Sequence, residues 1–384
     1  MGTIKLVSDT ISQDDIKDLI GWLETNPKLT KGELTVELEK EWAEKMGTKY
    51  SVFVNSGSSA ILLMVAALKE FNRLKNKKVV VSSLSWATDI STPMLLELEP
   101  ILVDCNLTDL SADLEHLEEI FISEEPSAFI SVAPLGFVPN MTDLVALCDK
   151  YDVLLLEDVC ESMGSKHKGN YLGSFGFASV FSMYFGHHVS TIEGGFINTN
   201  DEDFYHELLM MRSHGWDRDL PEWKQTELRT KYNVSEFESF YTFYVAGMNL
   251  RSTDLQAFIG LGAIKKLDRV SNIRLRNLET YLEEIPNNGF NLEIRESDFI
   301  SNFAYPMIHD RRNEIVKELA NIGVEVRPLI AGNMGRKPFW VDRYGVTALP
   351  NADLIHTNGF YVPNHQDITS KEIKIIGNII KKYE

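Results

Sequence analysis

The sequence is poor in cysteine and has no CxxC pair. Its three cysteines, Cys105, Cys148 and Cys160, lie far apart, and all three precede residue 161. A disulfide framework or a zinc site normally needs more cysteines at closer spacing. The sequence therefore indicates reduced thiols in a cytoplasmic protein, and it leaves the C-terminal half without cysteine ligands for an iron–sulfur cluster.

Two further absences narrow the class of protein. No apolar run approaches about 18 residues, and no basic segment followed by an apolar one opens the chain, so neither a membrane span nor a signal peptide is predicted. Positive charge is also scarce, because 38 lysines and arginines face 56 aspartates and glutamates, for a net charge of -18. Such an excess of acid argues against nucleic acid or a membrane surface as a partner, because both are polyanions.

What is present suits a two-domain globular protein. The chain has 384 residues, more than one hydrophobic core usually serves, and 44% of them are hydrophobic. Short apolar runs alternate with helical stretches, which predicts an α/β domain with a mainly parallel, seven-stranded sheet buried on both faces. The runs are Ser51–Val54, Val79–Val81, Pro100–Val103, Phe129–Ala133, Val153–Leu156, Val180–Phe185 and Phe196–Asn198.

The pattern changes near residue 250. We therefore expect residues 1–250 to form the large domain and residues 251–384 a smaller α+β domain. Long helices are predicted at Leu255–Val270 and Ile273–Glu284. The polar and aromatic stretch Leu220–Tyr244 is interpreted as an insertion or a partner-facing loop.

Small residues between a predicted strand and a predicted helix form the first candidate site, Asn55-Ser56-Gly57-Ser58-Ser59-Ala60. In open α/β sheets, ligands bind where strands end. Small side chains let the backbone approach an anion, and a helix N-terminus offers free N–H groups, so this segment predicts a phosphate cradle. The alternative is an ordinary helix start with Ser58 as its N-cap.

Three further segments place reactive or polar residues after strands. Trp86 follows a strand and could stack on a flat heterocycle or pack in the core. Asp158 ends an apolar strand, where a carboxylate needs a partner such as a protonated pyridine nitrogen, unless it caps the next helix. His187 and His188 precede Glu193-Gly194-Gly195, and no third ligand stands at a metal-like spacing, so no metal site is predicted.

In order and spacing, these segments match one family. The chain resembles the DegT-type sugar aminotransferases, fold type I pyridoxal phosphate (PLP) enzymes that act on nucleotide-linked keto-sugars. The resemblance covers nearly the whole chain and implies their two-domain fold. It is carried by Ile11-Ser12 through Thr30-Lys31-Gly32, Asn55–Ser58, Leu156-Glu157-Asp158, Ser182 through Gly195, and Gly247-Met248-Asn249-Leu250-Arg251.

One departure from the family pattern concerns the cofactor-anchoring lysine. In typical members this lysine precedes the Glu-Gly-Gly element with five residues between, and here His187 holds that position before Glu193. No lysine lies between Gly169 and Gly195. Imidazole lacks the primary amine of a Schiff base, so the resemblance implies that PLP, or its amine form PMP, is held non-covalently. A slip of one residue would transfer the role to His188.

A pair of histidines at this place is a feature of the sugar 3-dehydratases within the family. The resemblance thus implies an enzyme that removes the C-3 hydroxyl of a nucleotide-linked 4-keto-6-deoxyhexose and uses L-glutamate to regenerate PMP. His187 would serve as the base, since imidazole moves protons near neutral pH. The likeness extends to Cys160-Glu161-Ser162-Met163-Gly164, Ser213-His214-Gly215-Trp216 and Pro363-Asn364-His365-Gln366.

The same resemblance implies the cofactor contacts. Asp158 would pair with the pyridine nitrogen and keep the ring able to accept electrons, Trp86 would stack on the ring, and Glu161 would sit beside it. The residues implied to bind the cofactor phosphate are Gly57, Ser58 and Ser182.

Other residues are implied at the edge of the site. Asn249 and Arg251 match a segment that reaches the phosphate from the neighbouring subunit in relatives, which implies a homodimer with shared sites. His214 is a second catalytic candidate, although it could equally be a buried histidine at a helix end. Arg327 and Asn333 are candidates for contact with the nucleotide.

Three other readings compete. A true nucleotide-sugar aminotransferase would use a distant lysine and give an amino sugar. An iron–sulfur-dependent 3-dehydratase would need a cluster, for which the cysteines are badly placed. A catalytically silent binding protein would also lack the lysine, but its decay would not be expected to spare Asp158, Glu161 and Ser182 together.

Overall fold

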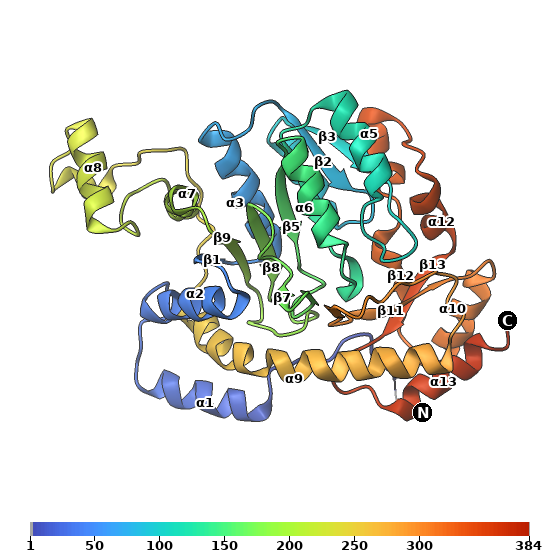
Figure 1. The fold of residues 1–384 in the computed structure, drawn as a ribbon. Helices are drawn as coiled ribbons and strands as arrows, with labels where there is room; N and C mark the ends of the chain where they lie inside the picture. The colour runs from blue at the N-terminus through green and yellow to red at the C-terminus, as the bar shows by residue number, and fades with distance from the viewer. Residues whose placement is uncertain (1–2, 384) are drawn as a thin grey trace.

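A seven-stranded sheet forms the centre of the computed structural model, which describes residues 3–383 (Figure 1). Its strand order is β1-β9-β8-β5-β4-β2-β3, and β9 runs antiparallel to β1 and β8 while the other pairs are parallel. The predicted mainly parallel sheet is confirmed. The strands are β1 (Tyr50–Val54), β2 (Lys78–Ser82), β3 (Glu99–Val103), β4 (Ala128–Val132), β5 (Leu154–Asp158), β8 (Ala178–Ser182) and β9 (Gly195–Thr199).

Helices connect these strands and cover the sheet. Every residue of β4 and β8 is buried, which explains why the central strands are apolar on successive positions. The helices of this part are α1 (Gln13–Glu24), α2 (Glu33–Met46), α3 (Gly57–Glu70), α4 (Ala87–Leu95), α5 (Leu114–Glu124), α6 (Met141–Lys150) and α7 (Glu202–Arg212).

The C-terminal part has its own antiparallel sheet, in the order β11-β13-β12. The N-terminal residues also lie here, because the Ile4 amide donates to the Gly323 carbonyl at 2.9 Å. The proposed boundary near residue 250 stays a prediction. The elements are β11 (Ala304–Ile308), α10 (Arg312–Asn321), β12 (Arg327–Pro328), α11 (Pro338–Tyr344), α12 (Pro350–Asn358), β13 (Gly359–Pro363) and α13 (Ser370–Ile380).

One helix, α9 (Asp254–Glu284), replaces the two that the sequence predicts between residues 255 and 284. The expected break at residues 271–272 does not occur. Ser271 is buried against neighbouring segments, and the Asn272 side chain donates to the Asp268 carbonyl one turn earlier at 2.7 Å. Tertiary packing therefore overrides the weak helix propensity of serine and asparagine. In Figure 1, α9 runs below both sheets.

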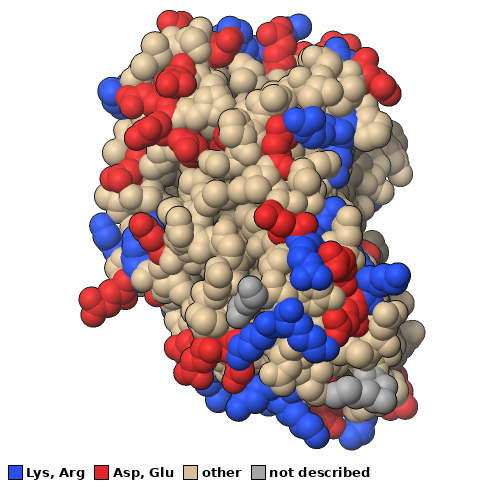
Figure 2. All heavy atoms as spheres, turned by 90° about the vertical axis from the view of Figure 1, so that its right-hand side faces the viewer, with Lys and Arg blue, Asp and Glu red and all other residues tan. Residues whose placement is uncertain are grey.

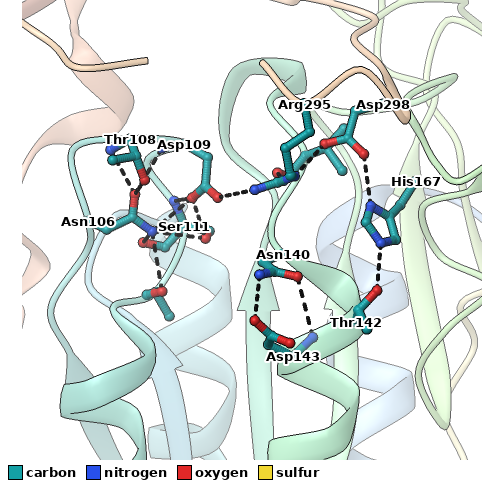
Figure 3. Close-up of polar contacts among 12 residues, drawn as sticks. Asn106, Thr108, Asp109, Ser111, Asn140, Thr142, Asp143, His167, Arg295 and Asp298 are labelled. Carbon is teal, nitrogen blue, oxygen red and sulfur yellow. Dashed lines mark hydrogen bonds and ion pairs between the residues drawn. The ribbon is translucent and has the colours of Figure 1, made fainter. Parts of the chain in front are cut away.

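A polar cluster around the buried His167 joins the segment that carries β10 (Asp298–Phe299) to the large sheet's helices (Figure 3). The His167 Nδ1 atom lies 2.8 Å from Asp298 Oδ1, and its Nε2 atom lies 2.8 Å from Thr142 Oγ1 on α6. Arg295 Nε donates to the other Asp298 oxygen at 2.8 Å. We call these four residues the His167 clasp. Backbone pairing adds to it, since β10 pairs with β6 (Lys166–His167), which also pairs with β7 (Asn170–Tyr171).

Residues 220–244 form an arm that projects away from the sheet (Figure 1). It contains α8 (Glu222–Tyr232) and the short helix η2 (Glu238–Tyr241), and none of the α8 residues is buried. An insertion at this place was predicted; whether it faces a partner stays a prediction. Its exposed aromatic residues are Trp223, Tyr232, Phe237, Phe240, Tyr241 and Phe243.

Charge is mixed over the face seen in Figure 2, where acidic and basic side chains are interspersed without a large field of one sign. Over residues 3–383, no helix combines the length and the apolar character that crossing a membrane requires. The same residues contain no group of three or more His, Cys, Asp or Glu side chains arranged to hold a metal ion.

Candidate active site

Asp158 ends the central strand β5 and is 6% exposed. Its Oδ1 atom accepts the Cys160 backbone N–H at 2.9 Å, and no cation among residues 3–383 forms an ion pair with it. A buried carboxylate without a counter-ion is costly. The site therefore favours a ligand that presents a positive, proton-bearing group to Asp158.

Glu161 lies three residues after Asp158, and its side chain is held by the strained backbone of Leu135. Its Oε2 atom accepts the Leu135 N–H at 3.1 Å, and Leu135 has a φ of 51° in the left-handed region. Such a conformation in a residue other than glycine costs about 1–3 kcal/mol, which the surrounding fold must offset. Burial raises the pKa of Glu161 to about 7, so this carboxyl group can hold or release a proton near neutral pH.

A third carboxyl group, which the sequence does not single out, belongs to Asp89 in the first turn of α4. Its side chain is buried, Oδ2 accepts the Trp86 N–H at 3.1 Å, and Oδ1 lacks a hydrogen-bond donor among the described residues. Burial and the adjacent Asp158 charge raise the pKa of Asp89 well above its usual range. An acidic residue at the third position of a helix is normally a capping residue, so the sequence pattern around Asp89 gives no sign of a role in the site.

The two adjacent histidines have different environments. His188 is 0% exposed, and its Nε2 atom lies 2.8 Å from the Ser301 carbonyl oxygen. His187 is only partly buried, and its ring centre lies 5.6 Å from that of Phe303. The Nδ1 atoms of both histidines have no hydrogen-bond partner among the described residues. Burial lowers the pKa of His187 to about 4, so its ring is neutral at pH 7 and able to accept a proton.

The loop after the histidines also has a strained backbone, at Ile192. Ile192 is β-branched and still has a φ of 73°, which is a genuine outlier for this residue type. The Ser190 hydroxyl accepts the Ile192 N–H at 2.9 Å, and the Thr191 hydroxyl donates to the Glu193 carbonyl at 2.9 Å. These bonds fix the hydroxyl-rich turn and hence the position of His187 at its start.

Arg274 on α9 lies behind the histidines and was also missed. It is 1% exposed and donates from Nη1 to the carbonyl oxygens of Asn302 at 3.4 Å and Phe303 at 2.9 Å. No acidic side chain among the described residues pairs with it, and burial lowers its pKa to about 9. Its charge contributes to the lowered pKa of both His187 and His188.

The predicted phosphate cradle comes together at the start of α3. The N-cap is Ser56, whose hydroxyl accepts the Ser59 N–H at 3.1 Å, so the alternative of Ser58 as N-cap is wrong. The exposed Ser58 hydroxyl is 3.5 Å from Thr88 Oγ1. A Cβ atom added to Gly57 would lie 2.6 Å from the Ser182 Cβ, so Gly57, Ser58 and Ser182 meet where free helix N–H groups can bind an anion.

Trp86 stands beside this cradle at the N-cap of α4 and is 61% exposed. Core packing, the alternative role for this residue, is therefore wrong. The indole is free to lie against a planar ligand.

Asn249, Arg251 and His214 lie on the outer edge of β1. Arg251 bridges Val54, and its Nε atom donates to Asn249 Oδ1 at 3.0 Å. The His214 ring lies 4.9 Å from the Trp216 ring. Within residues 3–383 none of the three has a hydrogen bond to the cradle, to Asp158, to Glu161 or to His187. Their roles stay predictions.

The two nucleotide candidates differ. Arg327 is exposed on β12, where a ligand could reach it. Asn333 is 0% exposed, and its amide nitrogen donates to the Asp353 carboxylate at 2.7 Å and to the Thr347 carbonyl at 3.2 Å. Nucleotide contact by Asn333 is therefore wrong, because both of its donors are used inside the protein.

The residues that are present fit a phosphorylated pyridine. The cradle suits the phosphate, the exposed indole suits the ring face, and Asp158 lacks a cationic partner. Together, the sheet order and this cluster define the class of fold type I PLP enzymes.

The model of the DegT/DnrJ/EryC1/StrS aminotransferase family matches residues 9–381. The chain belongs to this family. It is 33% identical over 388 residues to a GDP-4-keto-6-deoxy-D-mannose 3-dehydratase of Yersinia pseudotuberculosis, with 98% of each chain covered.

Two solved structures agree with this result. An Escherichia coli GDP-4-keto-6-deoxy-D-mannose-3-dehydratase with bound hydrated PLP is 31% identical, with a TM-score of 0.88 over 99% of both chains. A mutant of a GDP-4-keto-6-deoxymannose-3-dehydratase with bound GDP-perosamine is 30% identical, with a TM-score of 0.87 over 98% of this chain and 100% of that one.

Proposed function

We propose that the chain is a PLP- and PMP-dependent 3-dehydratase. Its substrate would be a nucleotide-linked 4-keto-6-deoxyhexose of the GDP-4-keto-6-deoxymannose type, and L-glutamate would regenerate PMP. The observation that carries the proposal is the His187 side chain at the lysine position, against the backbone of Cys160, which stands between Asp158 and Glu161 in the sequence. Among residues 3–383, no lysine forms a hydrogen bond or ion pair with these three side chains.

The residues described above would hold the cofactor without a covalent bond. Gly57, Ser58 and Ser182 would bind its phosphate, Trp86 would cover one ring face, and Asp158 would accept a hydrogen bond from the protonated ring nitrogen. When bound, the cofactor supplies an electron sink that stabilises negative charge on the substrate carbons. Ser56 is not expected to bind the phosphate, because its hydroxyl group already caps α3 by accepting the Ser59 N–H.

His187 would move the proton of the dehydration step. The ring is neutral at pH 7 because burial lowers its pKa to about 4, so it can remove a proton from carbon. The resulting imidazolium lies in surroundings that disfavour its charge, and it gives the proton to the departing C-3 hydroxyl, which leaves as water. A positioned base of this kind is worth about 10²–10⁴ in rate.

Glu161 would assist beside the ring. Because its pKa is about 7, both the protonated and the ionised form of Glu161 are present at neutral pH, so the group can donate or accept a proton. Since the Leu135 N–H occupies Oε2, the Oε1 atom is the one left to contact a ligand.

The test is a product analysis with purified protein, PMP, L-glutamate and 4-keto-6-deoxyhexoses linked to GDP, CDP, UDP or dTDP. We expect the GDP-linked sugar to lose its C-3 oxygen, with ammonia released in equal amount. An amino sugar without ammonia would instead establish an aminotransferase. Conversion of PLP to PMP by glutamate, followed by absorbance, separates an active enzyme from a silent binding protein.

We also propose a homodimer in the cytoplasm. The exposed aromatic residues of the arm support an interface, because large apolar patches on a surface usually mark binding sites. The unpaired Cys105 and Cys148, both buried, support a reducing compartment.

A further inference from the structure

Asp89 is a buried carboxyl group that the proposed function leaves without a role. Its side chain is 0% exposed in the first turn of α4, three residues after the exposed Trp86. One oxygen, Oδ2, accepts the Trp86 N–H at 3.1 Å, and the other, Oδ1, has no donor among the described residues. A buried carboxylate with one oxygen unpaired is strongly disfavoured, so the group needs either a proton or a cation.

The neighbouring charge that acts most strongly on Asp89 is the carboxyl group of Asp158. The strands that lead to them, β2 and β5, flank β4, and their carboxyl ends meet at one edge of the sheet. Two ionised carboxylates cannot share such a place, and pairs of this kind hold one proton between them. Glu161 adds further negative charge nearby.

The surroundings of the two groups decide where the proton lies. Asp158 already accepts the Cys160 N–H at 2.9 Å, a contact that favours its charged form. Asp89 has a backbone donor on Oδ2 only, and burial together with the Asp158 charge raises the pKa of Asp89 well above its usual range.

We propose that Asp89 is a positioning residue that keeps its proton, donates it to Asp158, and leaves Asp158 as the single ionised carboxylate facing the cofactor ring nitrogen. This inference rests on the proposed function, because it takes the ring nitrogen as the partner of Asp158. The same Asp89 side chain fixes the backbone that carries the Trp86 indole. One neutral carboxyl group thus orients both the counter-ion of the ring and the residue that covers its face.

Charge balance supports a neutral Asp89. One carboxylate beside one pyridinium forms a neutral pair, whereas a second buried carboxylate would leave one negative charge uncompensated. Asparagine can reproduce both contacts of a protonated aspartate, because its NH₂ group donates to Asp158 while its oxygen accepts from Trp86. Leucine has a similar volume and can make neither contact.

The experiment measures PMP binding by the full-length protein and the absorbance of bound PMP against pH. For Asp89→Asn we expect an affinity within about threefold of the unchanged protein and the same pH profile. For Asp89→Leu we expect affinity about 10- to 100-fold weaker and an altered absorbance profile. The matched control is Asp113→Asn, which changes a capping carboxylate that accepts two backbone N–H groups at the start of α5, away from the site.

An infrared measurement on the protein without cofactor gives an independent readout. The carboxylic-acid C=O band of Asp89 is expected at pH 7 as a difference between the unchanged protein and Asp89→Asn, and this arm needs no Leu variant. No such band, or an Asn variant as defective in binding as the Leu variant, would overturn the proposal; so would a Leu variant that binds normally. If the unchanged protein binds no PMP, the proposed function fails, and the infrared band still decides the protonation of Asp89.

Discussion

The Nε2 atom of His188 lies 2.8 Å from the carbonyl oxygen of Ser301, fully shielded from solvent. This contact uses the ring as a neutral donor that ties the histidine loop to the segment before β11. The Nδ1 atoms of both histidines lack a hydrogen-bond partner among the described residues, but His187 is partly exposed whereas His188 is fully buried. Neighbours in sequence therefore differ in what they can do, since one is a structural contact and the other can exchange a proton.

Substitution of the two histidines should separate these roles. His187→Asn should lower turnover by about 10²- to 10⁴-fold while PMP still binds and the fold keeps its stability. His188→Asn should instead lower the free energy of unfolding by about 1–3 kcal/mol, because the Ser301 carbonyl loses a buried donor. Steady-state kinetics, PMP titration and urea denaturation of both variants make the comparison, and near-normal dehydration by His187→Asn would contradict the base assignment.

A lysine at position 187 should restore the covalent bond that the family normally makes. His187→Lys is expected to form a PLP adduct that borohydride fixes, detected as a mass increase on the peptide that carries residue 187. The matched control is His188→Lys, whose side chain would replace a 0% exposed ring and should not be labelled. Labelling of the control and not of His187→Lys would show that the alignment is shifted by one residue.

Removal of Arg274 should raise the pKa of His187. Burial is the main cause of the lowered pKa of His187 and the Arg274 charge adds to it, so Arg274→Met should move the histidine titration, followed by NMR, upward from about 4. Since protonated His187 cannot act as base, the acid limb of kcat/KM should shift to higher pH in the same direction. Arg276→Met, an exposed change on the same helix, is the control and should leave the titration in place.

Glu161 should make stability depend on pH with a definite sign. Its folded-state pKa of about 7 exceeds the unfolded value, so the folded state binds more protons. The stabilisation from this group is complete below the unfolded pKa and is lost as pH rises toward and through 7. Relative to Glu161→Gln, the unchanged protein should lose about 1–3 kcal/mol between pH 5 and pH 8 in urea denaturation. A constant difference between the two proteins would contradict the raised pKa.

Strands and helix starts could be predicted from the sequence because their signals are local. Central strands such as β4 are buried on both faces, so their residues are apolar in succession. The cradle was predictable for the same reason, since Gly57 and Ser58 stand between a strand and a helix. The class of enzyme could be predicted from the order and spacing of the motif segments along the chain.

The remaining site residues depend on contacts between distant segments. Asp89 has the sequence pattern of an ordinary capping acid, and only the fold brings it to Asp158, 69 positions later in the chain. Arg274 stands on a helix, where an arginine is usually solvated, and its burial follows from packing against Asn302 and Phe303. The left-handed Leu135 that holds Glu161 has no local sequence signal, because its conformation is imposed by the fold.

The arm should control both assembly and cofactor binding. Phe237 and Tyr241 are 83% and 77% exposed, values that large apolar side chains rarely have unless a partner covers them. We expect the protein to be a dimer by light scattering, and the double variant Phe237→Ser, Tyr241→Ser to dissociate at least about tenfold more readily. Ile122→Ser, at 61% exposure on α5, is the matched control and should remain dimeric.

A linked loss of cofactor affinity would connect this interface to the site. Asn249 and Arg251 have no hydrogen bond to the cradle of their own chain among residues 3–383, and we expect them to bind the phosphate of the neighbouring subunit. The monomeric double variant should then bind PMP more weakly, and adding Arg251→Ala to it should cause no further loss. In the dimer, Arg251→Ala alone should weaken PMP binding. Equal effects of Arg251→Ala in both backgrounds would show that the residue acts within its own chain and that the two sites are not shared.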